Sequence, residues 1–158
     1  MIQQQRSGIK FERCFAWPNK QTFIIKPIKE LIKQEQTPGL WLDPFPFVYK
    51  QDALQHLKRF DTNSVDGVLF DPPYSPYQLA ECYKGIGQSW DGTSNTWSLW
   101  EAEIARVIKP GGKCIKFGWN THLISKDFEV TKIVLVNHGG HHNDTIVTVQ
   151  RKMNGSLL

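Results

Sequence analysis

Residues 65–74 have the sequence VDGVLFDPPY. Their first six residues are largely apolar or β-branched, which is typical of a strand buried in a sheet, and two prolines then end that strand. In open α/β sheets, ligands bind beyond the carboxyl ends of the strands, and the tetrapeptide Asp71-Pro72-Pro73-Tyr74 falls at such an end. This stretch therefore predicts both a buried strand and a ligand site where the strand stops.

Helical and apolar segments alternate on both sides of that strand. Apolar spacing predicts helices that begin near Pro27, at an Asp52 cap and at Trp100. Apolar runs predict further strands at residues 40–42, 113–117, 128–136 and 145–151. Residues 22–25 are β-branched or aromatic and predict a short strand or extended piece.

The order of these elements predicts an open α/β sheet with right-handed crossovers. The last two strands are joined by a short loop, so we expect them to form a C-terminal antiparallel hairpin in a mixed, mostly parallel sheet. Residues 75–97 form a long segment, with a helix expected at 78–84, and we expect the segment to be mobile. A length of 158 residues predicts one domain that spans residues 1–158.

The bulk composition indicates an ordinary globular protein with a basic balance. The formal net charge is +4 and the isoelectric point is about 9.0, which suits a polyanionic partner, although the lysines and arginines are scattered. The sequence has no long apolar run and no signal-peptide core, so we expect no membrane contact and a cytoplasmic location. The three cysteines are widely spaced and are expected to be reduced thiols.

The residue types of the tetrapeptide suit the activation of an amino group. Two prolines stiffen the turn, so that the Pro72 carbonyl becomes a fixed acceptor beside the Asp71 carboxylate. Two acceptors that draw on the hydrogens of an exocyclic amine would make its nitrogen more nucleophilic. Tyr74 offers a flat face for an extruded base. The structural alternative is an Asp-Pro-Pro turn followed by a core tyrosine.

Three stretches of the chain resemble one known family: residues 65–76, residues 108–113 and residues 139–145. The sequence is similar to small amino-methyltransferases of phages and mobile elements, described as adenine-specific DNA methylases, over residues 17–152. The resemblance implies a Rossmann-like methyltransferase fold and S-adenosylmethionine as cofactor. It also implies transfer of a methyl group to the exocyclic amino group of a flipped-out adenine in DNA.

The resemblance also implies roles for individual residues. The catalytic residues would be Asp71, Pro72, Pro73 and Tyr74. The cofactor would contact Thr22, Phe23, Lys26, Asp43, Pro44, Phe45, Asp52 and Asp71. The target base would contact Tyr74, Ser75, Tyr77, His141, His142 and Asn143.

Several of these residues have a structural alternative. Asp43 can be a turn residue, Asp52 a helix cap and Phe23 a core residue. The cluster of His138, His141, His142 and Asp144 invites a metal site, but it straddles a glycine turn, and we expect no metal there. A polar hairpin turn is the alternative to the base contact expected of this loop.

The chain departs from the family after Asp43. Only residues 44–51 separate Asp43 from Asp52, whereas a parallel crossover needs about a dozen residues. We therefore expect a fold truncated at its second strand, either because this sequence lacks a stretch of the natural protein or because half of the cofactor pocket has been lost. In the second case the protein would be a non-catalytic nucleic-acid binder.

Other amino-methyltransferase substrates also remain open. Related tetrapeptides serve enzymes that act on cytosine, RNA or a protein amide. The sequence has no separate target-recognition domain, so a homodimer or a partner subunit is a further candidate for the source of sequence specificity.

Overall fold

The computed structural model describes residues 8–46, 52–88, 96–140 and 142–155. Its sheet has the strand order β1-β5-β6-β4-β3-β2. The strands are β1 (Lys10–Phe15), β2 (Trp41–Leu42), β3 (Val65–Phe70), β4 (Ile108–Gly118), β5 (Phe128–Asn137) and β6 (Thr145–Lys152). Strand β6 runs antiparallel to both of its neighbours, and the other pairings are parallel. The predicted Rossmann-like α/β class, with a mostly parallel sheet and a C-terminal hairpin, is confirmed.

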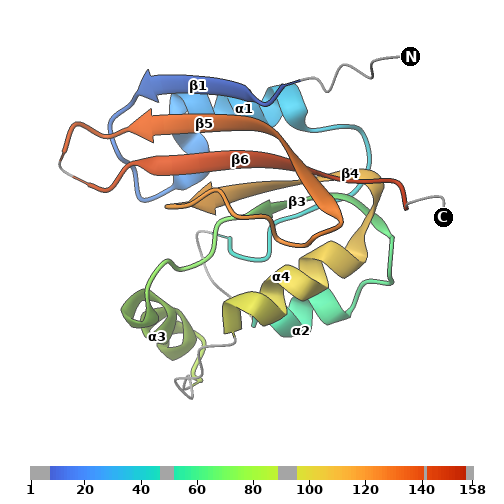
Figure 1. Cartoon of the computed structure of the whole chain (residues 1–158). Coiled ribbons are helices and arrows are strands. Elements are labelled where there is room, and N and C mark those ends of the chain that lie inside the picture. Colours follow the sequence, from blue (N-terminus) through green and yellow to red (C-terminus); the bar gives the residue numbers. More distant parts are fainter. Residues whose placement is uncertain (1–7, 47–51, 89–95, 141, 156–158) are drawn as a thin grey trace, which may run out of the picture.

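The helices lie on both faces of the sheet (Figure 1). They are the 3-10 turn η1 (Thr22–Ile24), α1 (Lys26–Glu35), α2 (Ala53–Lys58), α3 (Pro76–Gly85) and α4 (Thr96–Val107). Helix α1 buries Ile28 and Leu31 against Phe117 and Val136 on one face. Helices α2 and α4 cover β3 and β4 on the other face.

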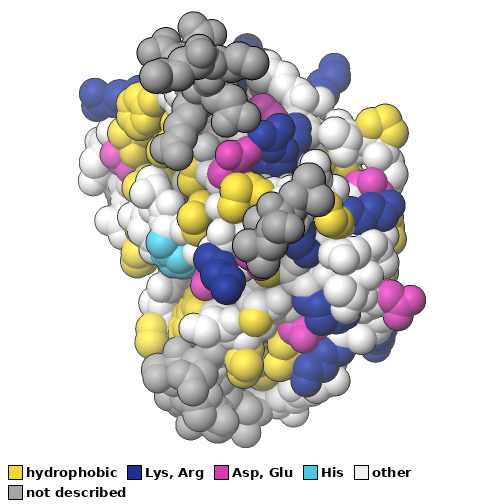
Figure 2. Space-filling view, turned by 45° about the vertical axis from the view of Figure 1, so that its right-hand side comes forward, with side chains coloured by type: hydrophobic (Ala, Val, Ile, Leu, Met, Phe, Trp, Pro, Cys, Tyr) yellow, Lys and Arg dark blue, Asp and Glu magenta, His cyan; other side chains and the backbone are white. Residues whose placement is uncertain are grey.

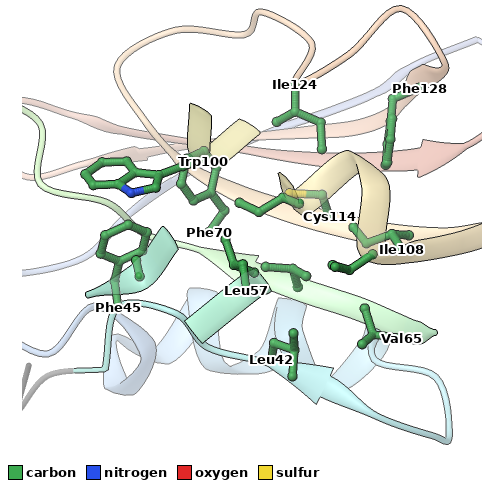
Figure 3. Packing of buried hydrophobic residues seen from close by; sticks show 14 of the residues in the cluster. Leu42, Phe45, Leu57, Val65, Phe70, Trp100, Ile108, Cys114, Ile124 and Phe128 are labelled. Carbon is green, nitrogen blue, oxygen red and sulfur yellow. The ribbon is translucent and has the colours of Figure 1, made fainter. Parts of the chain in front are cut away.

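The core under α2 and α4 holds the larger side chains (Figure 3). Trp100 and Phe70 are almost completely buried, and Phe45 packs between them with ring centroids 4.6 Å from Trp100 and 5.9 Å from Phe70. Buried aromatic residues contribute much apolar area and therefore much stabilisation. This cluster fixes the position of β3, at whose end the tetrapeptide lies.

Two elements differ from the sequence prediction near the N-terminus. Residues 10–15 form β1, an edge strand that the sequence analysis did not predict because charged and apolar side chains are mixed along it. Residues 22–24 form a 3-10 turn instead of an extended piece, and only Ile25 has extended dihedral angles, with φ −60° and ψ 119°. Pro27 then lies in the first turn of α1, where its missing N–H costs no hydrogen bond.

The Lys109-Pro110-Gly111-Gly112 stretch also behaves differently from the prediction. We expected it to separate a helix from a strand, but α4 ends at Val107 and β4 begins at Ile108. A Cβ atom on Gly112 would lie 2.8 Å from the backbone oxygen of Asp66. The glycine therefore allows β4 to pass close to β3.

The segment after the tetrapeptide contains more helix than predicted. Helix α3 spans Pro76–Gly85 rather than 78–84, and α4 begins at Thr96, before the expected start at Trp100. Residues 89–95 of this segment lie outside the described residues.

The sheet is short at the edge where the second strand was expected to be missing. Residues 43–52 alone connect β2 to α2. In the described part of the chain, β2 is the outermost strand at this edge and contains only Trp41 and Leu42. The described residues therefore do not form the half of the cofactor pocket that a second strand would supply.

The surface carries mixed charges. On the face shown in Figure 2, Lys and Arg side chains are scattered among acidic and apolar ones. None of the described helices has the length and apolar character needed to cross a membrane. The three cysteines are free thiols, of which Cys114 is buried.

Candidate active site

Asp71 follows the last residue of β3 at the carboxyl edge of the sheet. Its carboxylate accepts hydrogen bonds from the Tyr74 hydroxyl and from the Thr22 side chain. Burial raises the pKa of Asp71, and the two hydrogen bonds oppose that rise because they favour the charged form. Thr22 belongs to η1, so the N-terminal segment reaches the tetrapeptide, and its contact with a cofactor stays a prediction.

A second carboxylate lies near Asp71. Asp43 follows β2, which is the neighbour of β3. Burial raises the pKa of Asp43 to about 6; the hydrogen bond from the Phe45 amide lowers it, and the negative charge of Asp71 raises it further. Two poorly solvated carboxylates at adjacent strand ends form a site that favours a cationic group.

The turn of the tetrapeptide is held by hydrogen bonds on both sides. The Tyr74 amide donates to Gln78 Oε1 at 2.8 Å, and Trp97 Nε1 donates to the Pro73 carbonyl at 2.9 Å. Ser75 caps α3 and accepts from the Gln78 amide at 3.2 Å. Ser75 thus has a structural role, and the chain direction after Tyr74 is fixed.

Tyr74 also has an aromatic neighbour that the sequence analysis did not identify. The ring centroid of Trp119 lies 5.3 Å from that of Tyr74, with an angle of 32° between the ring planes. Trp119 follows Gly118, where a Cβ atom would come within 3.7 Å of the Tyr74 ring. The end of β4 therefore lies directly beside the tetrapeptide.

A cavity of about 460 Å³ opens beside this turn. One part of its lining is apolar or aromatic, from Phe70, Pro72, Tyr74, Pro76 and Trp97. The remainder is polar, from Ser98, Glu101, Lys116, Asn120 and His122. Ligand pockets of small molecules have volumes of roughly 300–1,000 Å³, so this cavity suits a group such as a nucleobase.

A larger cavity lies elsewhere. It measures about 1020 Å³, lies between α4 and residues 124–127, and is lined by none of the residues predicted for the site. Size alone would select it, but Pro72 and Tyr74 of the tetrapeptide line the smaller cavity together with Lys116, whose pKa is lowered by burial. The chemistry therefore favours the smaller one.

The polar part of the smaller cavity is organised around Lys116. Its ammonium group is almost completely buried and donates to Asn120 Oδ1 at 3.0 Å and to the His122 carbonyl at 3.2 Å. His122 Nε2 lies 2.7 Å from Glu101 Oε1, which is 3.8 Å from the ammonium. Burial lowers the pKa of Lys116, and the charge of Glu101 partly offsets this.

The sequence analysis missed this cluster, although one signal was present. Cys114 and Lys116 occupy alternate positions of a strand, and Cys114 is fully buried. Residues two apart in a strand face the same side. A lysine at an inward position of an apolar strand is usually paired with another polar group, and this marks Lys116 as a candidate site residue.

Several residues predicted to contact the cofactor have structural roles here. Asp52 Oδ1 accepts from the Gln55 amide at 2.9 Å, as a helix cap does, and Asp52 Oδ2 accepts from the Tyr83 hydroxyl at 2.7 Å. Phe23 packs against Phe117 with ring centroids 5.1 Å apart. The remaining three are placed as follows: Pro44 and Phe45 are buried, and Lys26 is exposed in the first turn of α1. A cofactor role for these residues stays a prediction.

The residues predicted to contact the target base are more dispersed. Tyr77 is 76% exposed on α3, and His142 and Asn143 are exposed in the loop between β5 and β6. His141 lies outside the described residues. His138 is buried, with Nδ1 at 2.7 Å from the Ala16 carbonyl and Nε2 at 2.9 Å from Thr145 Oγ1.

This arrangement gives His138 a structural role, because it ties the end of β1 to the hairpin. No group of three or more His, Cys, Asp or Glu side chains in the described ranges is placed to hold a metal ion.

Comparisons with known proteins give a fold-level similarity. No protein-family model matches the chain, and no curated protein does. Among solved structures, TrmN from Thermus thermophilus aligns with a TM-score of 0.43 and 19% identity over 63% of this chain and 26% of its own. The protein yhhF from Escherichia coli, provisionally described as a methyltransferase, aligns with a TM-score of 0.38 and 10% identity. The alignment covers 66% of this chain and 46% of yhhF.

A protein from Sulfolobus solfataricus, provisionally described as a type 11 methyltransferase, aligns with a TM-score of 0.39 and 15% identity. The alignment covers 93% of this chain and 86% of that protein. The chain spans about a quarter of the length of TrmN and less than half of yhhF. Because all of these TM-scores are below 0.5, the alignments support no argument about activity or substrate.

Proposed function

We propose that this chain is an S-adenosylmethionine-dependent amino-methyltransferase that acts on the exocyclic amino group of adenine in DNA. The observation that carries the proposal is the placement of Asp71, which is held by Thr22 and Tyr74 at the exit of β3. Pro72 and Tyr74 line a cavity at that exit. The choice of adenine and of DNA rests on the resemblance of the tetrapeptide to the phage and mobile-element family.

The carboxylates at the ends of β2 and β3 suit the methionine half of S-adenosylmethionine. S-adenosylmethionine carries a positive ammonium group and a positive sulfonium. Asp43 and Asp71 are neighbouring, poorly solvated carboxylates, and a cation between them would relieve their repulsion. When bound, this cofactor supplies an electrophilic methyl carbon.

The adenosine half finds less support. Asp52, the residue expected to accept from the cofactor's adenine, already accepts from Gln55 and Tyr83 with its two oxygens. An adenine amino group would have to share one of these oxygens, through its second lone pair, with the Gln55 amide or the Tyr83 hydroxyl. The pocket for this half is therefore weaker than the one for the methionine half.

The chain's own groups would act on the amine. The Asp71 carboxylate and the Pro72 carbonyl would accept hydrogen bonds from the two N–H groups. The nitrogen lone pair would bond to the methyl carbon as the carbon–sulfur bond breaks, with its electron pair left on sulfur as a neutral thioether. Tyr74 holds Asp71 in place through its hydroxyl. The same acceptors stabilise the positive charge that grows on the nitrogen before a proton is released to water.

The test is methyl transfer to DNA by the full chain with a radiolabelled cofactor. We expect Asp71→Ala to reduce the rate by roughly a hundredfold or more, as the loss of a preorganised electrostatic group does. Asp127→Ala is the matched control, since Asp127 is an exposed carboxylate outside the cavity. An Asp71→Ala protein that methylated at the wild-type rate would refute the proposal.

The second candidate is a non-catalytic nucleic-acid binder of the same fold. It is favoured by the engaged Asp52 carboxylate and by the outermost position of β2. Titration calorimetry with S-adenosylmethionine separates the two candidates. Micromolar binding supports the enzyme, and the absence of heat together with DNA binding supports the binder.

The substrate is tested in the same transfer assay. Adenine-containing and cytosine-containing DNA, RNA and a protein amide are offered as acceptors. Incorporation into adenine of DNA supports the proposal, and preference for another acceptor assigns the same tetrapeptide chemistry to that acceptor.

A further inference from the structure

One face of β1 carries a row of exposed apolar side chains. Phe11 and Phe15 are 64% and 54% exposed, with Arg13 between them. Trp17, two residues beyond the end of β1, is 68% exposed, and its ring packs edge-on against Phe15 with centroids 5.2 Å apart. Odd-numbered residues share one side of a strand. The even-numbered Cys14 packs with the opposite core, beneath α1. The odd-numbered face is therefore the one that points away from α1.

Within the described residues no helix covers this face, referred to below as the bare face, because the crossover from β4 to β5 contains none. Residues 119–127 make that connection, and all of them are described. Figure 1 shows α1 on one side of β1 and β5, with no helix opposite it. Parallel strands are normally covered on both faces. Exposed aromatic rings on an uncovered sheet indicate a surface that meets a partner.

The bare face is continuous with the candidate active site. The strand register places Arg13 opposite Leu135, Leu135 opposite Ile146, and Ile146 opposite Gly118. Gly118 adjoins the Tyr74 ring. Four strand spacings separate β1 from β3, which is roughly 19 Å. A few nucleotides of an unpaired strand can span that distance.

We propose that this face, formed by Phe11, Arg13, Phe15 and Trp17, binds an unpaired stretch of nucleic acid that flanks the target base. The proposal rests on the function proposed above for the identity of that base. Flat rings accept stacked bases of any sequence, and an arginine among them can contact a phosphate or stack on a base. The formal net charge of +4 favours a polyanion.

Extension of the sheet by a second copy of the chain, paired at the β1 edge, is disfavoured. Antiparallel pairing of two β1 edges about a twofold axis must be centred on a residue. The two registers with the greatest overlap are centred on Glu12 or Arg13. Each places two like charges directly opposite one another, which destabilises a strand pair.

The test is fluorescence anisotropy with a labelled single-stranded DNA of 12 nucleotides and the full chain, without cofactor. We expect the double variant Phe11→Ala/Trp17→Ala to weaken binding by roughly 25-fold or more, since each stacked base contributes roughly five- to 100-fold in affinity and two rings are lost. Arg13→Gln should lower the salt dependence of binding by about 0.7 in log–log slope. The conservative variant Phe11→Tyr should bind as the wild type does.

Leu40→Ala is the matched control, because Leu40 is 46% exposed beside β2, at the opposite edge of the sheet. It should leave the affinity unchanged. Equal affinity of the double variant and the wild type would overturn the proposal, as would wild-type binding to duplex DNA only. A wild-type dimer that the double variant dissociates in sedimentation would also overturn it, in favour of self-association.

The assay separates this inference from the proposed function. Asp71→Ala should bind the oligonucleotide normally, because Asp71 is not on the β1 face. If the wild type shows no methyl transfer but binds through Phe11 and Trp17, the proposed function fails and the binding surface stands. If methyl transfer occurs and the aromatic variants bind normally, the binding surface fails and the proposed function stands.

Discussion

The hydroxyl of Tyr74 donates a hydrogen bond to the carboxylate of Asp71, three residues earlier in the same turn. The side chain therefore has two functions, since its hydroxyl orients the acceptor and its ring lines the cavity. Burial and the charge of Asp71 raise the pKa of Tyr74, so the phenol stays protonated and remains a donor. The turn is preorganised before any substrate arrives.

The two functions of Tyr74 can be separated by substitution. Tyr74→Phe keeps the ring and removes one hydrogen bond, which should cost about 0.5–1.5 kcal/mol in transition-state stabilisation. Tyr74→Ala should cost a further 1–3 kcal/mol or so, because the stacking face is also lost. Single-turnover methyl transfer measures both. Equal rates for the two variants would show that the ring contributes nothing.

Asp43 predicts a pH dependence of stability. Its pKa in the folded protein is about 6, against an ordinary value of 3.8. A raised folded pKa means that the folded state binds the proton more tightly. The contribution to stability is therefore fully present below pH 3.8 and is lost as the pH rises through about 6. We expect the free energy of unfolding to fall across that window.

The check is urea unfolding followed by tryptophan fluorescence at several pH values between these limits. Asp43→Asn cannot ionise, and it should flatten the fall relative to the wild type. Superimposable pH profiles for the two proteins would mean that Asp43 is fully solvated. Asp71 shifts in the same direction and should leave a residual slope.

The polar cluster around Lys116 predicts coupled effects on stability. Glu101→Gln removes the only carboxylate facing this buried ammonium within the described residues, and it should lower the free energy of unfolding by about 1–3 kcal/mol. Lys116→Met removes the ammonium itself. The double variant should lose less than the sum of the single losses, because no uncompensated charge remains. Strict additivity in urea titrations would contradict this interpretation.

Substitution of Phe45 tests whether this side chain belongs to the core. It is 8% exposed and packs against Phe70 and Trp100. Phe45→Ala should lower the free energy of unfolding by about 3–5 kcal/mol, as other large-to-small aromatic substitutions in cores do. Ile24→Ala is the control, since Ile24 is 55% exposed and should change stability by less than about 0.5 kcal/mol. If Phe45→Ala were as stable as the wild type, the predicted cofactor contact of Phe45 would be favoured over a role in the core.

The sequence predicted most of the sheet because buried strands such as β3 and β5 are strongly apolar. It did not predict β1, because charged and apolar side chains are mixed along that strand. It singled out the tetrapeptide at the end of β3 because local chemistry and family resemblance point to it, but it did not predict the hydrogen bond between Thr22 and Asp71. It missed Lys116, His122 and Glu101, which lie on three separate segments and are brought together only by the tertiary fold.

Asp52 illustrates the limit of reasoning from a motif. An acidic residue before an apolar helix serves equally well as a ligand acceptor and as a cap. The choice depends on Tyr83, which comes from α3 and occupies the second oxygen. No local pattern around Asp52 reveals that partner.

The bare face of β1 and β5 also divides the protein into regions of unequal protection. Amides of β3 lie between two covered faces, whereas those of β1 lie at an edge with one face open to water. Opening of the sheet at β1 requires the separation of one strand pair only. In deuterium-labelling time courses, β1 should exchange first and β3 last, and this order would make the outer strand a separate cooperative unit of the fold.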